Sequence, residues 1–213
     1  MSRPRVLVAD DHSVILAGLY SLLKADFDVV GAVEDGRAAL EAAQWLKPDV
    51  IILDISMPLL NGIEAAVRLG KMVPQTKIIF LTMHGDVAFL KEAFRAGASG
   101  YVTKRSAASE LVTAIHEVMK GRTYITPLLT REMMGSFLDP AEHPDKLSPR
   151  LTPRQREVLQ LVAEGRSNKE IGAILKVSTK TVEFHKFNLM RTLGIHTTAE
   201  LTRYALKHGF ISI

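Results

Sequence analysis

Short apolar runs without polar alternation divide the N-terminal part of the chain. They occupy positions 6–9, 29–33, 50–53, 78–81 and 101–102. Such runs are typical of strands that are buried on both faces. Segments with helical periodicity lie between and after them, at 12–25, 36–46, 61–71, 85–96 and 106–120. This alternation predicts an α/β domain, a (βα)5 unit of flavodoxin-like length whose parallel sheet is covered by helices. The strand order 2-1-3-4-5 suits that length, although periodicity alone does not set the order.

The pattern changes after position 121. Residues 121–137 leave room for one more short helix after Pro127. Residues 138–150 contain three prolines and few periodic apolar positions, a composition that is typical of linkers. We therefore expect three parts: a first domain at 1–121, a linker at 122–147 and a second domain at 148–213.

The second domain carries the start signals of short helices. A Ser or Thr that is followed three residues later by Gln or Glu forms a capping box, which satisfies the backbone of the first helical turn. The pairs that fit are Thr152 with Gln155 and Ser167 with Glu170. Ser178 caps a third helix, and a fourth helix begins near Thr198. Short helices joined by tight turns predict a small all-α helix-turn-helix domain.

Composition narrows the class of protein. With 47% hydrophobic and 23% charged residues, the 213-residue chain has the balance of a globular protein. It has no cysteine, which excludes disulfides, thiolate metal sites and a cysteine nucleophile. No apolar stretch approaches the ~18 residues that a membrane span needs. We therefore expect a soluble, cytoplasmic protein without a membrane partner.

Charge separates the two domains. Positions 147–213 hold 11 Lys and Arg against 5 Asp and Glu, a net charge of +6. The rest of the chain holds 16 basic against 18 acidic residues, a net charge of −2. A basic second domain favours a nucleic-acid partner, and a solvated basic face is the alternative.

Polar side chains follow the predicted strands of the first domain. Asp10 and Asp11 follow the first strand, Asp54 the third, Thr82 ends the fourth, and Lys104 comes after the fifth. Because ligands of such sheets bind beyond the carboxyl ends of the strands, we expect these side chains to converge. Crowded carboxylates need a cation, and oxygen ligands of this kind suit Mg²⁺. A carboxylate beside that metal can accept a phosphoryl group.

Each of these residues has an ordinary explanation when it is taken alone. An aspartate after a strand is often a turn residue, and Asp11 could cap the helix that begins at His12. Thr82 suits a strand, and a lysine such as Lys104 is usually solvated. Their joint position at the strand ends favours a functional cluster.

The third helix of the second domain has an unusual outward face. At 100° per residue, one side carries Val182, His185, Leu189 and Leu193, and the opposite side carries Lys180, Phe184, Phe187 and Arg191. Two cations with two aromatic rings suit a DNA major groove, where cations meet phosphates or guanine and rings touch thymine methyls. Thr179 and Thr181 stand at the helix start, where backbone amides bind phosphate. The alternative is that one of the rings packs against a neighbouring helix or against the first domain.

Four segments of the first domain resemble the receiver domain of bacterial two-component response regulators. They are VLVADD at 6–11, IILDISMP at 51–58 followed by Asn61-Gly62, LT at 81–82 and GASGYVTK at 97–104. The resemblance covers about residues 3–121 and implies that a sensor histidine kinase phosphorylates Asp54. It implies that Asp10, Asp11, Asp54 and the main-chain carbonyl of Ser56 bind Mg²⁺.

The same resemblance implies a switch pair. The Thr82 hydroxyl would move onto the phosphoryl group while the ring of Tyr101 turns inward, and Lys104 would neutralise the new charge. From its position alone, Tyr101 is also explained as a half-buried aromatic residue on an edge strand.

Three segments of the second domain resemble the LuxR-type helix-turn-helix: LTPRQREVL at 151–159, GRSNKEIG at 165–172 and STKTVEFH at 178–185. With the receiver, the whole chain is similar to the NarL/FixJ family of response regulators. The resemblance makes 178–192 the recognition helix for double-stranded promoter DNA and implies a homodimer on activation, with RNA polymerase as a further partner. Glu183 would accept from a cytosine amino group or tune specificity. Phe187 stands where the family more often has a small or polar residue.

The leading hypothesis is thus a phosphorylation-controlled transcription factor and not an enzyme. One alternative is a Mg²⁺-dependent phosphatase or phosphotransferase whose basic tail binds protein or RNA. Against it, the segment Asp54-Ile55-Ser56 has no acid two residues after the aspartate, and the chain has no Gly-x-x-x-x-Gly-Lys loop. The other alternative is a DNA-binding regulator that does not depend on phosphorylation.

Overall fold

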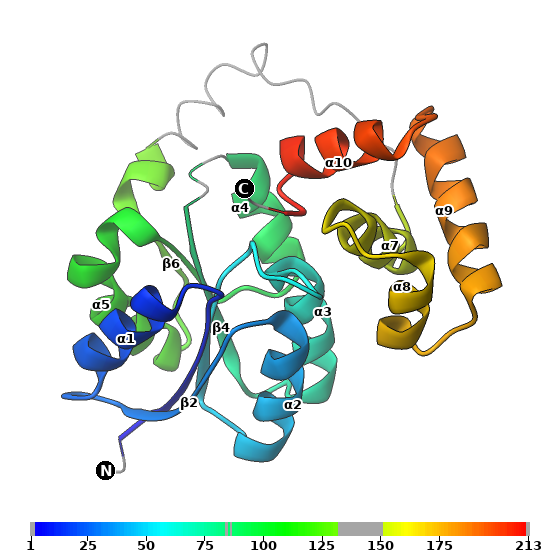
Figure 1. The fold of residues 1–213 in the computed structure, drawn as a ribbon. Coiled ribbons are helices and arrows are strands. Elements are labelled where there is room, and N and C mark those ends of the chain that lie inside the picture. Colours follow the sequence, from blue (N-terminus) through cyan, green and yellow to red (C-terminus); the bar gives the residue numbers. More distant parts are fainter. Residues whose placement is uncertain (1–2, 84, 86, 132–150, 212–213) are drawn as a thin grey trace.

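The computed structural model describes residues 3–83, 85, 87–131 and 151–211, which form an α/β domain and a helical domain (Figure 1). The α/β domain is built on a six-stranded parallel sheet in the order β2-β1-β3-β4-β5-β6. Its strands are β1 Arg5–Ala9, β2 Asp28–Val33, β3 Val50–Leu53, β4 Lys77–Thr82, β5 Gly100–Thr103 and β6 Tyr124–Ile125. The predicted fold class and the order of the first five strands are confirmed.

Helices cover both faces of this sheet (Figure 1). They are α1 Ser13–Leu23, α2 Gly36–Leu46, α3 Gly62–Met72, α4 Val87–Arg95 and α5 Ala107–Met119. Buried residues of α1 and α5 form one apolar cluster with the sheet, and those of α2, α3 and α4 form the other. β1 and β3 are almost fully buried because both of their faces are covered, which explains their unbroken apolar runs.

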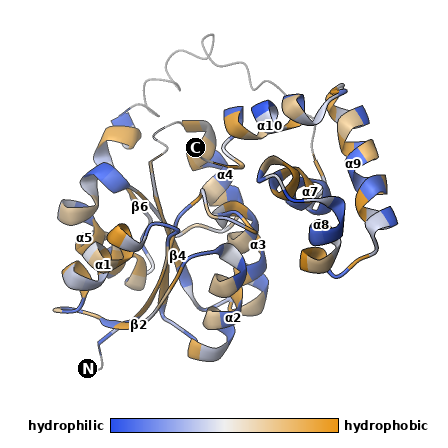
Figure 2. Cartoon of the chain, viewed as in Figure 1, coloured by the Kyte–Doolittle hydropathy of each residue, from blue (hydrophilic) through white to orange (hydrophobic). Residues whose placement is uncertain are grey.

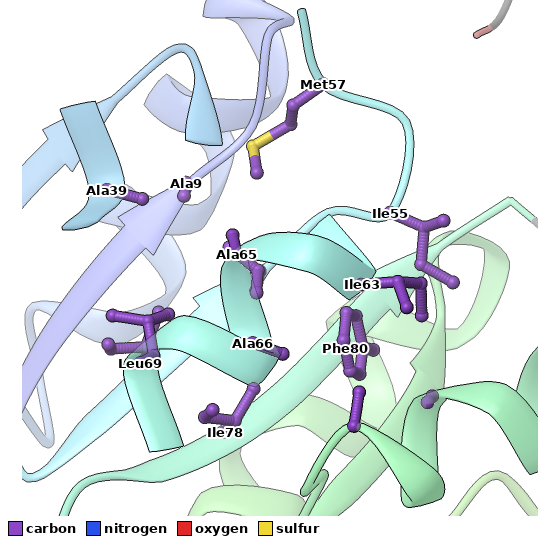
Figure 3. Packing of buried hydrophobic residues seen from close by; sticks show 14 of the residues in the cluster. Ala9, Ala39, Ile55, Met57, Ile63, Ala65, Ala66, Leu69, Ile78 and Phe80 are labelled. Atoms are coloured by element: carbon purple, nitrogen blue, oxygen red, sulfur yellow. The ribbon is translucent and has the colours of Figure 1, made fainter. Parts of the chain in front are cut away.

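The α2–α4 side of the sheet is packed with small and branched side chains. Phe80 of β4 lies beside Ile63 and Ala66 of α3 (Figure 3). The alanines allow α3 to approach the sheet closely, and Met57 fills the space near the end of β1. This packing holds the start of α3, and the loop before it, directly over the end of β3.

The expectation of five strands is wrong in one respect, because Tyr124–Ile125 form a sixth strand beside β5. A strand of two residues gives no periodic signal, so sequence pattern does not reveal it. As a result β5 is an inner strand. Tyr101 is fully buried, and its interpretation as a half-buried edge residue is wrong. Residues 127–131 are helical, as expected after Pro127, and the remainder of the predicted linker lies outside the described residues.

The second domain consists of four short helices around one apolar core. They are α7 Pro153–Ala163, α8 Asn168–Leu175, α9 Thr179–Leu193 and α10 Thr198–Lys207. Both predicted capping boxes are present, at Thr152 and at Ser167. The Ser178 side chain accepts from the backbone N–H of Thr181, and Gly194 ends α9 at a positive φ of 64°. The helical prediction for this domain is confirmed.

Hydropathy is distributed differently in the sheet and along α9. The strands of the sheet are largely hydrophobic, whereas hydrophobic and hydrophilic residues alternate along α9 (Figure 2). Within the described part of the chain, every helix is too short or too polar to cross a bilayer.

Candidate functional site

Strand register brings the predicted acidic residues together. In the parallel pair β1 and β3, Ala9 lies opposite Leu53, so the residues that follow, Asp10 and Asp54, leave the sheet side by side. The amide of Asp54 donates to the carbonyl of Ala9 at 2.9 Å, which extends the ladder by one bond. The two carboxylates are nearly inaccessible, with 1% and 3% of the residue exposed.

Lys104 reaches the same point from the end of β5. Its Nζ lies 2.8 Å from Asp54 Oδ2 and 2.7 Å from Asp10 Oδ2. The other oxygen of Asp54, Oδ1, accepts from the backbone N–H of Ile55 at 2.8 Å. One cation therefore bridges two buried carboxylates, and a backbone amide holds the Asp54 carboxylate in orientation.

These contacts oppose the effect of burial. Burial raises the pKa of Asp54 to about 6, although Lys104 and the Ile55 amide lower it and the Asp10 charge raises it further. Burial by itself would lower the pKa of Lys104, but Asp54 and Asp10 together raise that pKa above its ordinary value. The two carboxylates therefore favour the charged form of Lys104, and Lys104 favours the ionised form of Asp54 against the effect of burial.

His12 joins this cluster, although the sequence pattern did not predict it. Its Nδ1 lies 2.7 Å from Asp11 Oδ1 and 3.2 Å from Asp10 Oδ1, and its backbone N–H donates to Asp10 Oδ1 at 3.0 Å. His12 is also the residue before the first turn of α1. Its position next to two acids in the sequence could have indicated a place in the cluster. The same position was instead explained by the start of a helix.

The loop between β3 and α3 passes over the cluster and carries Ser56. The amide of Gly62 donates to the carbonyl of Ile55 at 2.8 Å, which closes the loop. A Cβ at Gly62 would lie 2.0 Å from the carbonyl oxygen of Asp54, so this approach requires glycine. Asn61 then caps α3, since its side chain accepts from the amide of Glu64.

The two expected switch residues lie inside the core. Thr82 ends β4 and Tyr101 lies on β5, and neither is accessible to solvent. The ring of Tyr101 is 6.5 Å from that of Phe80 between centroids and tilted by 44°. The ring is therefore already turned inward in this structure.

The acidic cluster has the donor set of a hard cation. One atom from each of Asp10, Asp11, His12 and Asp54 lies within 4.8 Å of the others. Three of the four groups are carboxylates, and the fourth is an imidazole. The donor chemistry fits Mg²⁺, which takes one or two carboxylates together with phosphate oxygens and water.

The second candidate surface is the outer face of α9. Phe184 and Phe187 are 63% and 65% exposed, and Lys180 and Arg191 are exposed beside them. Val182 and Leu189 are buried in the core, as the helical pattern predicted. The structure therefore does not pack either ring against a neighbouring helix or against the first domain.

At the start of α9 the predicted polar residues lie on the same open side. Thr179 and Glu183 are exposed and Thr181 is half-buried. The Thr181 hydroxyl lies 2.8 Å from that of Ser178. The face thus combines cations, hydroxyls, two aromatic rings and one carboxylate.

Comparisons with known proteins agree with this architecture. Residues 6–116 match the family model for the response regulator receiver domain, and residues 149–205 match that for the luxR family of bacterial regulatory proteins. The chain is 37% identical over 210 residues to the transcriptional regulatory protein MctR of Rhizobium johnstonii, covering 98% of this chain and 95% of that protein. It is also 37% identical over 211 residues to the oxygen regulatory protein NreC of Staphylococcus haemolyticus, covering 95% and 97%.

Solved structures give the same result. The response regulator RcsB of Salmonella typhimurium superposes with a TM-score of 0.66 at 31% identity, covering 96% of this chain and 97% of that one. A structure of the RcsB–DNA complex gives a TM-score of 0.59 at 30% identity, covering 95% and 98%. The chain belongs to the two-component response regulators that join a receiver domain to a LuxR-type helix-turn-helix, as in the NarL/FixJ family.

Proposed function

We propose that phosphorylation of Asp54 by a sensor histidine kinase controls binding of this regulator to promoter DNA. The observation that supports this proposal is the bridge from Lys104 to Asp54 and Asp10, which stabilises the ionised form of a buried carboxylate at the carboxyl end of the sheet. A buried carboxylate whose ionised form is stabilised in this way is suited to act as a nucleophile.

In the transfer step, an Asp54 oxygen attacks the phosphorus of a phosphohistidine. The O–P bond forms and the P–N bond breaks, and the imidazole keeps the electron pair and takes up a proton. Asp10, Asp11, Asp54 and the carbonyl of Ser56 would hold Mg²⁺, which supplies positive charge to the phosphoryl oxygens. Lys104 neutralises the added charge on the acyl phosphate, 2.8 Å from where Asp54 Oδ2 now lies.

Thr82 and Tyr101 are the proposed switch pair. Thr82 lies at the end of the strand next to β3, so it stands at the same edge of the sheet as Asp54, and its hydroxyl would move onto the phosphoryl group. Tyr101 starts from a buried position in this structure. The pair therefore signals through a shift of β4 and β5 and their loops more than through entry of the ring into the core.

The outer face of α9 is the proposed DNA-reading surface. It consists of Thr179, Lys180, Thr181, Glu183, Phe184, Phe187 and Arg191. Lys180 and Arg191 supply charge for phosphates, and the exposed rings suit thymine methyl groups in the major groove. The RcsB–DNA complex, a structural relative, supports duplex DNA as the ligand.

The remaining expectations extend this proposal. The sequence pattern places the receiver domain at 1–121, a linker at 122–147 and the DNA-binding domain at 148–213. Because β6 pairs with β5 and Leu129 is buried in the core of the sheet, we propose that the receiver extends to residue 131. The regulator acts in the cytoplasm, forms a homodimer on activation and contacts RNA polymerase at the promoter. It accepts one phosphoryl group per chain and is not a turnover enzyme.

The test is intact mass after incubation with Mg²⁺ and a small-molecule phosphodonor. We expect one phosphoryl adduct on wild type and none on Asp54→Ala. Asp26→Ala, which removes an exposed aspartate of the same domain, is the matched control and keeps the adduct. Repeated turnover of the donor would instead support the phosphatase. An adduct without any change in DNA affinity would support the phosphorylation-independent regulator.

A further inference from the structure

One helix of the DNA-binding domain contacts the loop that begins at the phosphoacceptor. Gln160 of α7 is 1% exposed and lies against the β3–α3 loop. Its Oε1 accepts from the backbone N–H of Asn61 at 2.8 Å, and its Nε2 donates to the carbonyl of Met57 at 2.8 Å. The side chain thus bridges two points of the loop that are four residues apart.

Glu164, one turn further along the chain, takes a third backbone group of the same loop. Its Oε1 accepts from the N–H of Leu59 at 3.0 Å and from Nε2 of Gln160 at 2.8 Å. The loop therefore bonds to α7 through its own main chain at Met57, Leu59 and Asn61. Such bonds restrain backbone direction and are independent of the side chains of the loop.

The backbone of the loop is strained at Leu59 and is stabilised by contacts with the other domain. Its φ is +64°, a left-handed conformation that costs free energy for any residue except glycine. Its side chain packs against the apolar core of the DNA-binding domain. Contacts across the domain boundary thus offset local strain beside the site.

Ion pairs of two buried glutamates fix the docking geometry around the loop. Arg156 pairs with Glu64 of α3, and Glu157 pairs with Arg68 of α3. Both glutamates are buried. Because a buried charge needs its partner, these pairs allow little sliding of α7 along α3.

Docking leaves the proposed DNA-reading surface uncovered. α9 lies on the side of its domain away from the sheet (Figure 1), with Phe184 and Phe187 exposed. Occlusion of α9 by the receiver is therefore not the effect of this contact. Docking acts instead on the β3–α3 loop. This loop carries Ser56, which precedes Met57 and follows Asp54 by two residues.

We propose that Gln160 and Glu164 are positioning residues for the phosphoacceptor site, because they hold the β3–α3 loop in its docked conformation. This inference rests on the proposed function. If phosphorylation of Asp54 weakens docking of the DNA-binding domain by some factor, then docking weakens binding of a phosphoryl group and its Mg²⁺ by the same factor, because the coupling of two sites is reciprocal. The DNA-binding domain thus acts back on the chemistry of the receiver.

The experiment uses the full chain and beryllium fluoride, a mimic of the acyl phosphate, at saturating Mg²⁺. Binding is measured by titration, and docking is measured by amide exchange of Leu59 and Asn61, whose N–H groups bond to α7. Gln160→Ala is the main variant. Gln44→Ala, an exposed glutamine of α2, is the matched control, and Asp54→Ala identifies binding elsewhere.

We expect Gln160→Ala to speed the exchange of both amides. We also expect it to lower the beryllium fluoride concentration at half-saturation about fivefold relative to Gln44→Ala. Glu164→Ala is expected to act in the same direction and replaces Gln160→Ala if that variant does not fold. Equal or weaker binding with faster exchange overturns the inference alone. Absence of binding in wild type, or equal binding in Asp54→Ala, overturns the proposed phosphoacceptor site and this inference with it.

Discussion

The phosphoacceptor site and the outer face of α9 depart from the usual distribution of side chains in opposite ways. At the site, carboxylates of Asp10 and Asp54 and the ammonium of Lys104 are buried. On α9, two phenylalanine rings face solvent. Each departure is costly for a folded domain, and each is understandable as a surface prepared for a ligand.

The difference lies in what holds each arrangement. The charges of the site are compensated within the receiver by Lys104 and by the amide of Ile55. The rings of α9 are placed by the helix alone, since Val182 and Leu189 orient its opposite side. Loss of a compensating residue should therefore damage the site strongly, whereas single changes on α9 should alter DNA binding in small, separable steps.

The largest effect is expected from Lys104→Met, which removes the bridging cation and keeps much of the side-chain volume. Phosphoryl acceptance should fall about 100-fold, because the new charge is no longer stabilised. In the absence of divalent metal, the pKa of Asp54 should rise above its value of about 6, since the cation favours the ionised carboxylate. NMR titration of the Asp54 carboxyl and the rate of adduct formation measure the two effects. Lys71→Met, at an exposed lysine of α3, should change neither, and an unchanged Asp54 pKa in Lys104→Met would contradict the bridge.

A smaller effect is expected from Gly62→Ala, which tests the packing above the site. The new Cβ would meet the Asp54 carbonyl at 2.0 Å, so α3 must shift, at a cost of about 1–3 kcal/mol. Gly70→Ala is the control on the same helix, where a Cβ meets nothing within 4 Å, and should stabilise by about 0.5–1 kcal/mol. Native-state amide exchange of β1 and β3 reports both changes. Equal stability of the two variants would show that the close approach is unimportant.

The convergence of Asp10, Asp54 and Lys104 was predictable from sequence because parallel strands place their carboxyl ends at one edge. Once the apolar runs are identified as strands, the register of the parallel sheet determines where the residues that follow each strand lie. The caps at Thr152 and Ser167 were predictable for a similar reason, since the motif and its hydrogen bonds span only three residues. Local rules of this kind do not depend on the rest of the fold.

The contact between the domains was not predictable in the same way. Gln160 and Glu164 look like ordinary polar residues of an amphipathic helix, and their partners lie 103, 99 and 105 positions away along the chain. Periodicity identifies which side of a helix is polar, but not which part of that side another domain covers. The sequence did not predict β6 or the role of His12 either. The strand β6 is too short to form a pattern, and His12 coincides with the start of a helix.

The smallest effects are expected on α9, where the comparison becomes sharpest. Lys180→Ala should weaken binding to all DNA sequences alike and should reduce the slope of affinity against salt by about one ion, because it removes one phosphate contact. Binding isotherms at several salt concentrations measure this. Lys71→Ala removes the same charge from an exposed position of the receiver. An equal change in slope in that variant would show that Lys180 acts through the net charge of the protein and not through a phosphate contact.

Phe187→Ala is expected to separate sequence preference from affinity on the same face. The ring carries no charge, so the salt slope should stay as in wild type. Its loss should cost about 1 kcal/mol of discrimination at the base pairs that it touches. Selection from a randomised DNA library, followed by salt titration, measures both quantities. Trp45→Ala, at an exposed aromatic residue of the receiver, is the control and should change neither. If Phe187→Ala left the selected sequences unchanged and flattened the salt slope, the ring would act by supporting the cations beside it, and α9 would read only the DNA backbone at this position.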